Sequence, residues 1–214
     1  MSTDKDKNPK TKNAPSLWLF FSFNLALLLT SYFANNFSQL TSDFHSILNI
    51  RSTSVLISPL ILFIVNGFLS SDQKAILVFW KSKDTLPGCR AFSVYGPKDY
   101  RVDMSKVQSK HGPLPVVPIQ QNQLWYKLFK LHKNDSMVFT SHQQYLLARD
   151  LTTIAFLFMI FAGIPFLLLG KYPLNWFYLV LMVLQYLVTA IVAQNYGKRF
   201  VTNVLAVDCT NIKS

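Results

Sequence analysis

Two long uncharged segments in the second half of the chain constrain its fold more than any other feature. Residues 151–170 and 173–195 contain no Asp, Glu, Lys or Arg. At 1.5 Å per helical residue, each run reaches about 30 Å, the thickness of a bilayer core. Gly170 suits a helix end and Pro173 suits the first turn of the next helix. The pattern predicts a tight helical membrane hairpin.

Two earlier apolar runs, 17–34 and 54–70, predict another membrane hairpin over residues 17–70. None of the four runs contains a charged side chain, which argues against a proton-coupled transporter or pump. A few polar residues remain inside the runs and form a candidate intramembrane polar interface: Asn24, Asn66, Gln185 and Thr189. We favour contacts between helices or subunits for them, with possible homo-oligomers, and a wet pore formed by assembly is the alternative.

The remaining chain divides into three polar parts. Residues 1–16 are predicted to be a disordered basic tail, 71–150 a helical cytoplasmic domain, and 197–214 a cytoplasmic tail after the hairpin at 151–196. Of the 21 Lys and Arg residues, nineteen lie in these parts and two lie in the opposite loops. This asymmetry predicts a multi-pass protein of the bacterial inner membrane with both termini in the cytoplasm. The predicted fold is therefore an all-α membrane protein with four transmembrane helices as two hairpins, and a small helical domain between them.

Local signals divide the domain at 71–150 into helices. Asp103 is a good N-cap for a helix over 104–110, and Pro118 suits the first turn of a helix that ends at His132. Asp135 is placed to cap a further helix, which we expect to continue through Arg149 and Asp150 into the third span. Such a continuous helix would couple the domain to the membrane.

The net charge of +11 predicts an anionic partner. Lys127, Lys130 and Lys133 recur every three residues and are interleaved with Trp125, Tyr126 and Phe129. For these aromatic residues we favour the core over stacking on bases. We favour membrane lipid or protein as the partner of the lysines, and phosphate contact with a nucleic acid is the alternative.

Catalytic signatures are missing from the sequence. It has no G-x-S-x-G, H-E-x-x-H or phosphate-cradling glycine loop, and its two cysteines, Cys89 and Cys209, lie in no metal-ligand spacing. His111, His132 and His142 would form a metal or Cys/His site only if the fold gathered them, and surface or capping roles are favoured. We therefore expect no enzymatic activity, no cofactor and no metal. Arg101 with Asp103, and Arg149 with Asp150, are interpreted as structural ion pairs.

Residues 86–150 contain a series of short motifs. They read LPGCRAF, then RVD, GPLP, QNQLWYKL and finally RDL. This series resembles a bacterial family of small membrane effector proteins associated with retron antiphage defence systems. Tyr100 departs from the family pattern, which has proline before the arginine of the RVD turn. The matching motif positions are Pro87, Gly88, Arg90, Phe92, Arg101, Asp103, Gly112, Pro113, Pro115, Asn122, Trp125, Tyr126, Arg149 and Asp150.

The resemblance implies a toxic effector that is held inactive by a reverse transcriptase with its attached DNA. Release during phage attack would let it damage the inner membrane and cause abortive infection. The alternative is a non-toxic accessory subunit of a membrane channel or transport complex. The candidate partner-sensing residues are Arg90, Arg101, Asp103, Trp125, Tyr126, Lys127, Lys130, Lys133, Arg149 and Asp150.

Overall fold

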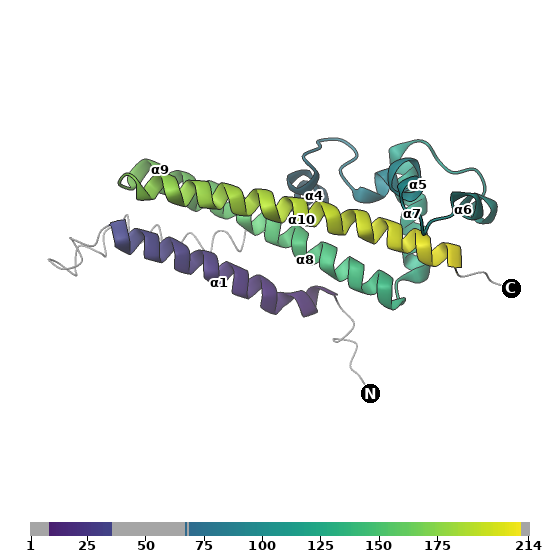
Figure 1. Ribbon diagram of the computed structural model, residues 1–214, viewed down its shortest axis with the longest axis horizontal. Coiled ribbons are helices and arrows are strands. Elements are labelled where there is room, and N and C mark those ends of the chain that lie inside the picture. Colours follow the sequence, from purple (N-terminus) through teal and green to yellow (C-terminus); the bar gives the residue numbers. More distant parts are fainter. Residues whose placement is uncertain (1–8, 36–66, 68, 211–214) are drawn as a thin grey trace, which may run out of the picture.

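A computed structural model describes residues 9–35, 67 and 69–210, and every regular element among them is helical (Figure 1). Some of these elements are long rods and others are single turns. They are α1 (Pro9–Asn35), α4 (Ser71–Phe79), the 3₁₀ turn η3 (Pro87–Arg90), the π-helical turn η4 (Ala91–Tyr95), α5 (Gly96–Lys98), α6 (Met104–His111), α7 (Pro118–His132), α8 (Ser136–Phe158), the π-helical turn η5 (Met159–Gly163), α9 (Ile164–Leu169) and α10 (Leu174–Thr210).

Three of the described helical stretches are long and apolar enough to cross a membrane. They cover Pro9–Ala34, Ser136–Leu169 and Leu174–Thr210. Most of the expected second span, including Asn66, lies outside the described residues, as does the loop between 36 and 53.

The chain after residue 135 forms two helical rods that run antiparallel to each other. α8, η5 and α9 follow one another without a break, and α10 returns along them (Figure 1). Proline explains the π-helical turn, because Pro165 has no N–H to donate to the previous turn. α1 lies against α8, where Leu28 joins a core formed by Phe158, Met182 and neighbouring apolar side chains. The apolar contacts of α1 in the described chain are thus made with the second hairpin.

Helix α1 begins earlier than the sequence indicated. The tail predicted to be disordered through Ser16 is helical from Pro9 onward. Its polar residues find partners on the part of α8 that precedes residue 151. Asn13 and Gln143 exchange two hydrogen bonds of 2.9 and 3.2 Å, and the Lys12 ammonium lies 5.1 Å from the centre of the Phe139 ring. These contacts compensate for the lack of apolar surface in this segment.

The segment 197–214 was predicted to be a tail, but α10 continues through it to Thr210. Val201, Val204 and Leu205 are fully buried in the core of the small domain. Lys198 and Arg199 follow the uncharged run, but they do not end the helix. The apolar run that follows them supplies the surface on which the other domain helices pack.

The three helices predicted from capping signals in the domain are confirmed. Asp103 accepts hydrogen bonds from the N–H groups of Ser105 and Lys106 at the start of α6. Pro118 opens α7, and Asp135 caps α8, which runs through residues 149 and 150 as expected. A continuous helix therefore joins the domain to the apolar stretch after residue 150.

Helix α4 closes the domain against both long rods. Val78 and other apolar side chains of α4 belong to the domain core, so the apolar stretch 75–80 is a core segment of the domain. The Gln194 side chain donates to the Val78 carbonyl at 2.7 Å, and the Trp80 indole donates to the Tyr186 hydroxyl at 2.9 Å. Gly197 allows this close approach, because a Cβ there would lie 2.9 Å from the Phe79 ring.

Candidate functional site

The least expected polar group of the domain is Asp208, near the end of α10. Its carboxylate is only 4% exposed and accepts hydrogen bonds from His111 Nε2 at 2.8 Å and His132 Nε2 at 2.9 Å. The Lys110 ammonium donates to the Asp208 backbone carbonyl. Because His111 ends α6 and His132 ends α7, this one carboxylate fastens the C-terminal ends of three helices.

Burial raises the pKa of the Asp208 carboxyl. Hydrogen bonds from His132 and His111 act in the opposite direction, and with the nearby positive charge they outweigh burial, so the pKa lies below its usual value. The carboxylate is therefore ionised in the folded domain at neutral pH. A buried carboxylate that accepts two hydrogen bonds from imidazoles costs less than an isolated one, and the Lys110 ammonium suits the C-terminal ends of α6 and α10. Asp208 and its partners therefore hold α6, α7 and α10 together.

The described residues show neither a cluster of metal ligands nor an exposed thiol. Among these residues, no group of three or more His, Cys, Asp or Glu side chains is placed to hold a metal ion. Cys89 and Cys209 are both buried, and burial raises the pKa of each thiol. The Cys209 thiol donates to the Asp103 carbonyl at 3.6 Å, which fits a packing role.

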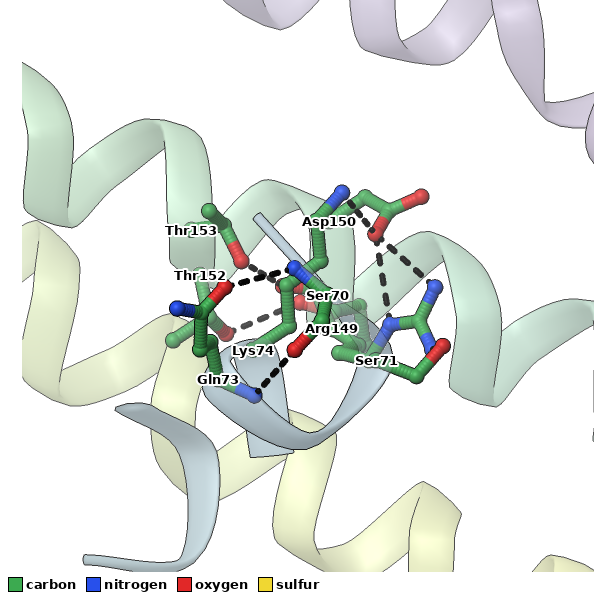
Figure 2. Close-up of polar contacts among 9 residues, drawn as sticks. Ser70, Ser71, Gln73, Lys74, Arg149, Asp150, Thr152 and Thr153 are labelled. Atoms are coloured by element: carbon green, nitrogen blue, oxygen red, sulfur yellow. Dashed lines mark hydrogen bonds and ion pairs between the residues drawn. The ribbon is translucent and has the colours of Figure 1, made fainter. Parts of the chain in front are cut away.

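A second polar cluster lies where α8 enters its apolar half (Figure 2). The Lys74 ammonium lies 3.1 Å from Asp150 Oδ1, and the Arg149 guanidinium contacts the same oxygen at 3.2 and 3.3 Å. Both cations are 8% exposed. The predicted pairing of Arg149 with Asp150 is thus present, but sequence reasoning missed Lys74, which lies 76 residues away.

The start of α4 holds this cluster in place. Ser70 and Gln73 form a reciprocal capping box, in which the Gln73 N–H donates to Ser70 Oγ and the Ser70 N–H donates to Gln73 Oε1 (Figure 2). The Arg149 guanidinium also reaches Ser71 Oγ at 3.5 Å. The box fixes the direction of α4, so that Lys74 on its first turns faces Asp150. The cluster therefore fastens α4 to α8 at the expected membrane boundary.

The residues expected to sense a partner along α7 separate into two faces. Tyr126, Lys127, Lys130 and Lys133 are exposed, whereas Trp125 is buried. The Trp125 ring packs edge-on against Phe200 at 5.0 Å, and its indole N–H donates to the Val201 carbonyl at 3.4 Å. Trp125 therefore belongs to the core in this structure, and the three lysines form the accessible stripe.

The other partner-sensing candidates are bound within the chain. Arg90 donates to the Asp84 carbonyl, and Asp103 caps α6. The predicted pairing of Arg101 with Asp103 is replaced by a bidentate one, because Arg101 contacts both oxygens of Asp99 at 3.0 and 2.7 Å. Its guanidinium holds the pKa of Asp99 well below the usual range. Arg101 and Asp103 therefore fix the turn and the cap before α6, and Arg90 holds the segment before η3.

Gln121 is a structural residue that the sequence interpretation overlooked. Its side chain is 1% exposed, and its oxygen accepts from the N–H groups of Phe92 and Ser93 and from the Ser93 hydroxyl. Its amide nitrogen donates to the Val116 carbonyl at 2.9 Å. Gln121 thereby satisfies the irregular backbone of η4 and joins it to α7. Its place directly before Asn122 in the QN motif was the available signal.

The expected intramembrane polar interface is not gathered into one place among the described residues. Asn24 on α1 is fully buried and donates to the Phe20 carbonyl of its own helix. Thr189 on α10 likewise donates to the carbonyls of Gln185 and Tyr186. The side-chain oxygens of Asn24 and Gln185 are buried and accept no hydrogen bond within the described chain. Asn24 is not hydrogen-bonded to the α10 pair within these residues.

Comparison with protein-family models, curated proteins and solved structures gives no match to this chain.

Proposed function

We propose that the protein is a membrane-acting toxic effector of a bacterial antiphage system of the retron type. In this proposal its partners are a reverse transcriptase and the DNA attached to it, which hold it inactive in the resting cell. When released, it perturbs the inner membrane without enzymatic chemistry. The motifs between residues 86 and 150 support the assignment, since they resemble that effector family.

One structural observation supports this proposal above the others. The two rods that carry the apolar spans are also the scaffold of the polar domain. Val201 and Val204 of α10 lie in the same core as Trp125 of α7, and Ala148 of α8 joins them. A partner that binds or leaves the domain therefore acts on helices that continue into the bilayer. This coupling is what a regulated membrane effector requires.

The proposed membrane arrangement has four spans in two hairpins, with both termini and the domain in the cytoplasm. Two features support it. The start of α1 and the end of α10 lie in the same half of the described structure as α5 to α7, and the turn after α9 lies at the other end (Figure 1). The second feature is the distribution of Lys and Arg, of which Lys171 is one of only two assigned to the far side, whereas Lys133 lies at the end of α7 in the domain.

Cysteine labelling tests this arrangement directly. Lys133→Cys and Lys171→Cys are made in a background that carries Cys89→Ser and Cys209→Ser. In intact cells, a membrane-impermeant maleimide should label position 171 from the periplasm and should reach position 133 only after cell lysis. Labelling of both positions in intact cells, or of position 133 alone, would contradict the arrangement.

Inducible expression in a bacterium tests the toxic function. The chain expressed alone should reduce viability, and co-expression with its reverse transcriptase and DNA should restore it. Normal growth, with membrane insertion confirmed, would contradict toxicity by the chain itself. The accessory-subunit interpretation would then take precedence.

A further inference from the structure

We propose that the exposed face of α7, formed by Tyr126, Lys127, Lys130 and Lys133, binds a nucleic-acid strand through its phosphates. The inference names the chemical class of a partner that contacts this chain directly. It rests on the membrane placement given in the proposed function.

Every acidic or basic side chain on the exposed face of α7 is a lysine. Residues 118–133 contain no Asp or Glu, and Lys127, Lys130 and Lys133 are all exposed. They recur at spacings of three, so they lie on one side of the helix. The opposite side of α7 is buried through Trp125 and Leu128. The helix is thus held firmly by its apolar side while its cationic side faces outward.

The acidic side chains near α7 already have hydrogen-bond or ion-pair partners within the fold. Asp208 accepts from two histidines, and Asp99 forms a bidentate pair with Arg101. Asp103 and Asp135 each accept two backbone N–H groups as N-caps, so their carboxylates are held at helix starts. In the described chain, no carboxylate lies within ion-pair distance of Lys127, Lys130 or Lys133. The ammonium groups of these three lysines are therefore available to an anionic partner.

Distance from the membrane separates a lipid partner from a soluble one. Helix α7 contacts α10 through Val201 and Asp208. These positions lie six and thirteen residues beyond Asn195, which is about 9 and 20 Å along the helix. The Debye length is only about 8 Å at physiological salt. The end of the face at Lys133 is therefore largely screened from the bilayer surface, while the end near Lys127 lies about one Debye length from it.

Tyr126 favours a nucleic acid among the soluble polyanions. Its ring is 47% exposed, and the Lys130 ammonium lies 5.2 Å from its centre. An exposed ring beside several lysines suits a strand, because a base can stack on the ring while neighbouring phosphates meet the ammonium groups. An acidic protein segment would use the lysines but would gain less from the ring.

A binding assay with purified full-length protein tests this inference. The protein is placed in nanodiscs of neutral phosphatidylcholine, and a fluorescein-labelled single-stranded DNA of about twenty nucleotides is titrated by anisotropy. The test variant is Lys127→Gln/Lys130→Gln/Lys133→Gln. The matched control, Lys81→Gln/Lys83→Gln/Lys198→Gln, removes the same charge from exposed positions elsewhere. Circular dichroism confirms that both variants are folded.

Three lost phosphate contacts should reduce the slope of log K against log salt by about 2, and should weaken binding about 50-fold near 0.15 M salt. The control should bind within a few-fold of the native protein. Tyr126→Leu should weaken binding about tenfold while leaving the salt slope unchanged. This last result separates base stacking from simple attraction between opposite charges.

Three outcomes would overturn the inference. They are no saturable DNA binding by the native protein, equal losses in the test and control variants, and binding to anionic vesicles that requires these lysines when DNA binding does not. The assay uses no toxicity readout, so it fails separately from the proposed function. Toxicity without DNA binding would refute only this inference, and DNA binding without toxicity would refute only the effector role.

Discussion

The buried imidazole of His142 makes the stability of the domain depend on pH. The ring lies on α8, stacked on Phe200 at 4.9 Å and edge-on to Phe129 at 5.0 Å. Burial lowers the pKa of His142 from 6.5 to about 4, and the charges of Arg149 and Lys10 lower it further in the same direction. The folded domain therefore keeps this ring neutral at a pH where the unfolded chain protonates it.

The sign of the effect follows from the proton balance. Above pH 6.5 the ring is neutral in both states, and the contribution of His142 to stability is fully present. As the pH falls from about 6.5 to about 4, the unfolded chain binds a proton that the folded chain does not, so stability is lost. A pKa difference of about 2.5 units corresponds to a loss of about 3 kcal/mol by pH 4.

The assay compares the native protein with His142→Phe, which keeps an aromatic ring against Phe200. Denaturant unfolding in detergent, followed by tryptophan fluorescence, gives the free energy of unfolding at about pH 7 and about pH 4.5. The native protein should lose about 2 to 3 kcal/mol more than the variant between these two values. Equal losses in both proteins would show that His142 is not held neutral by burial, and would refute the reasoning.

The other structural predictions concern the groups that fasten the domain. Asp208→Ala should lower the free energy of unfolding by about 3 kcal/mol, because two partly buried histidines lose their acceptor; thermal melts of the detergent-solubilised protein check this. Gly88→Ala should cost about 1 to 3 kcal/mol by the same melts, since its new Cβ would lie 2.6 Å from the Trp125 ring. Gln121→Leu should cost about 2 to 4 kcal/mol by denaturant titration, because it leaves backbone donors of η4 unsatisfied, whereas exposed Gln120→Leu should change little.

The helices that could be predicted from sequence are those with a local start signal. Asp103, Pro118 and Asp135 each define a helix start by their own chemistry, and all three helices begin there. The long uncharged runs likewise predicted apolar helices, of which three are present in the described chain. These features depend on neighbouring residues, so a single sequence contains enough information to place them.

The features that could not be predicted depend on contacts between distant residues. His132 and Asp208 are 76 positions apart, and nothing near either residue indicates that they meet. Residues 197–210 were assigned to a tail because Lys198 and Arg199 follow the uncharged run, although the segment after them contributes to the domain core.

The glycines of the family-like motifs have a physical role that the structure makes plain. Gly88 lies against Trp125 and Asn122, so the LPG and QN-x-x-W motifs are two sides of one contact. Gly197, outside those motifs, lets α10 pass close to Phe79 and Tyr145. Close helix contacts of this kind make the domain and the two rods a single packed unit.

Coupling between that unit and the membrane is the central claim, and the timing of depolarisation tests it most directly. A potential-sensitive dye and viability are followed together after induction of the native chain, Leu147→Pro and Leu147→Ala, at matched levels of inserted protein. Proline at residue 147 removes a backbone hydrogen bond within α8, between the domain and the third span. The native chain and the alanine variant should depolarise cells before viability falls, and the proline variant should do neither. Death before depolarisation, or equal depolarisation by the proline variant, would contradict the account.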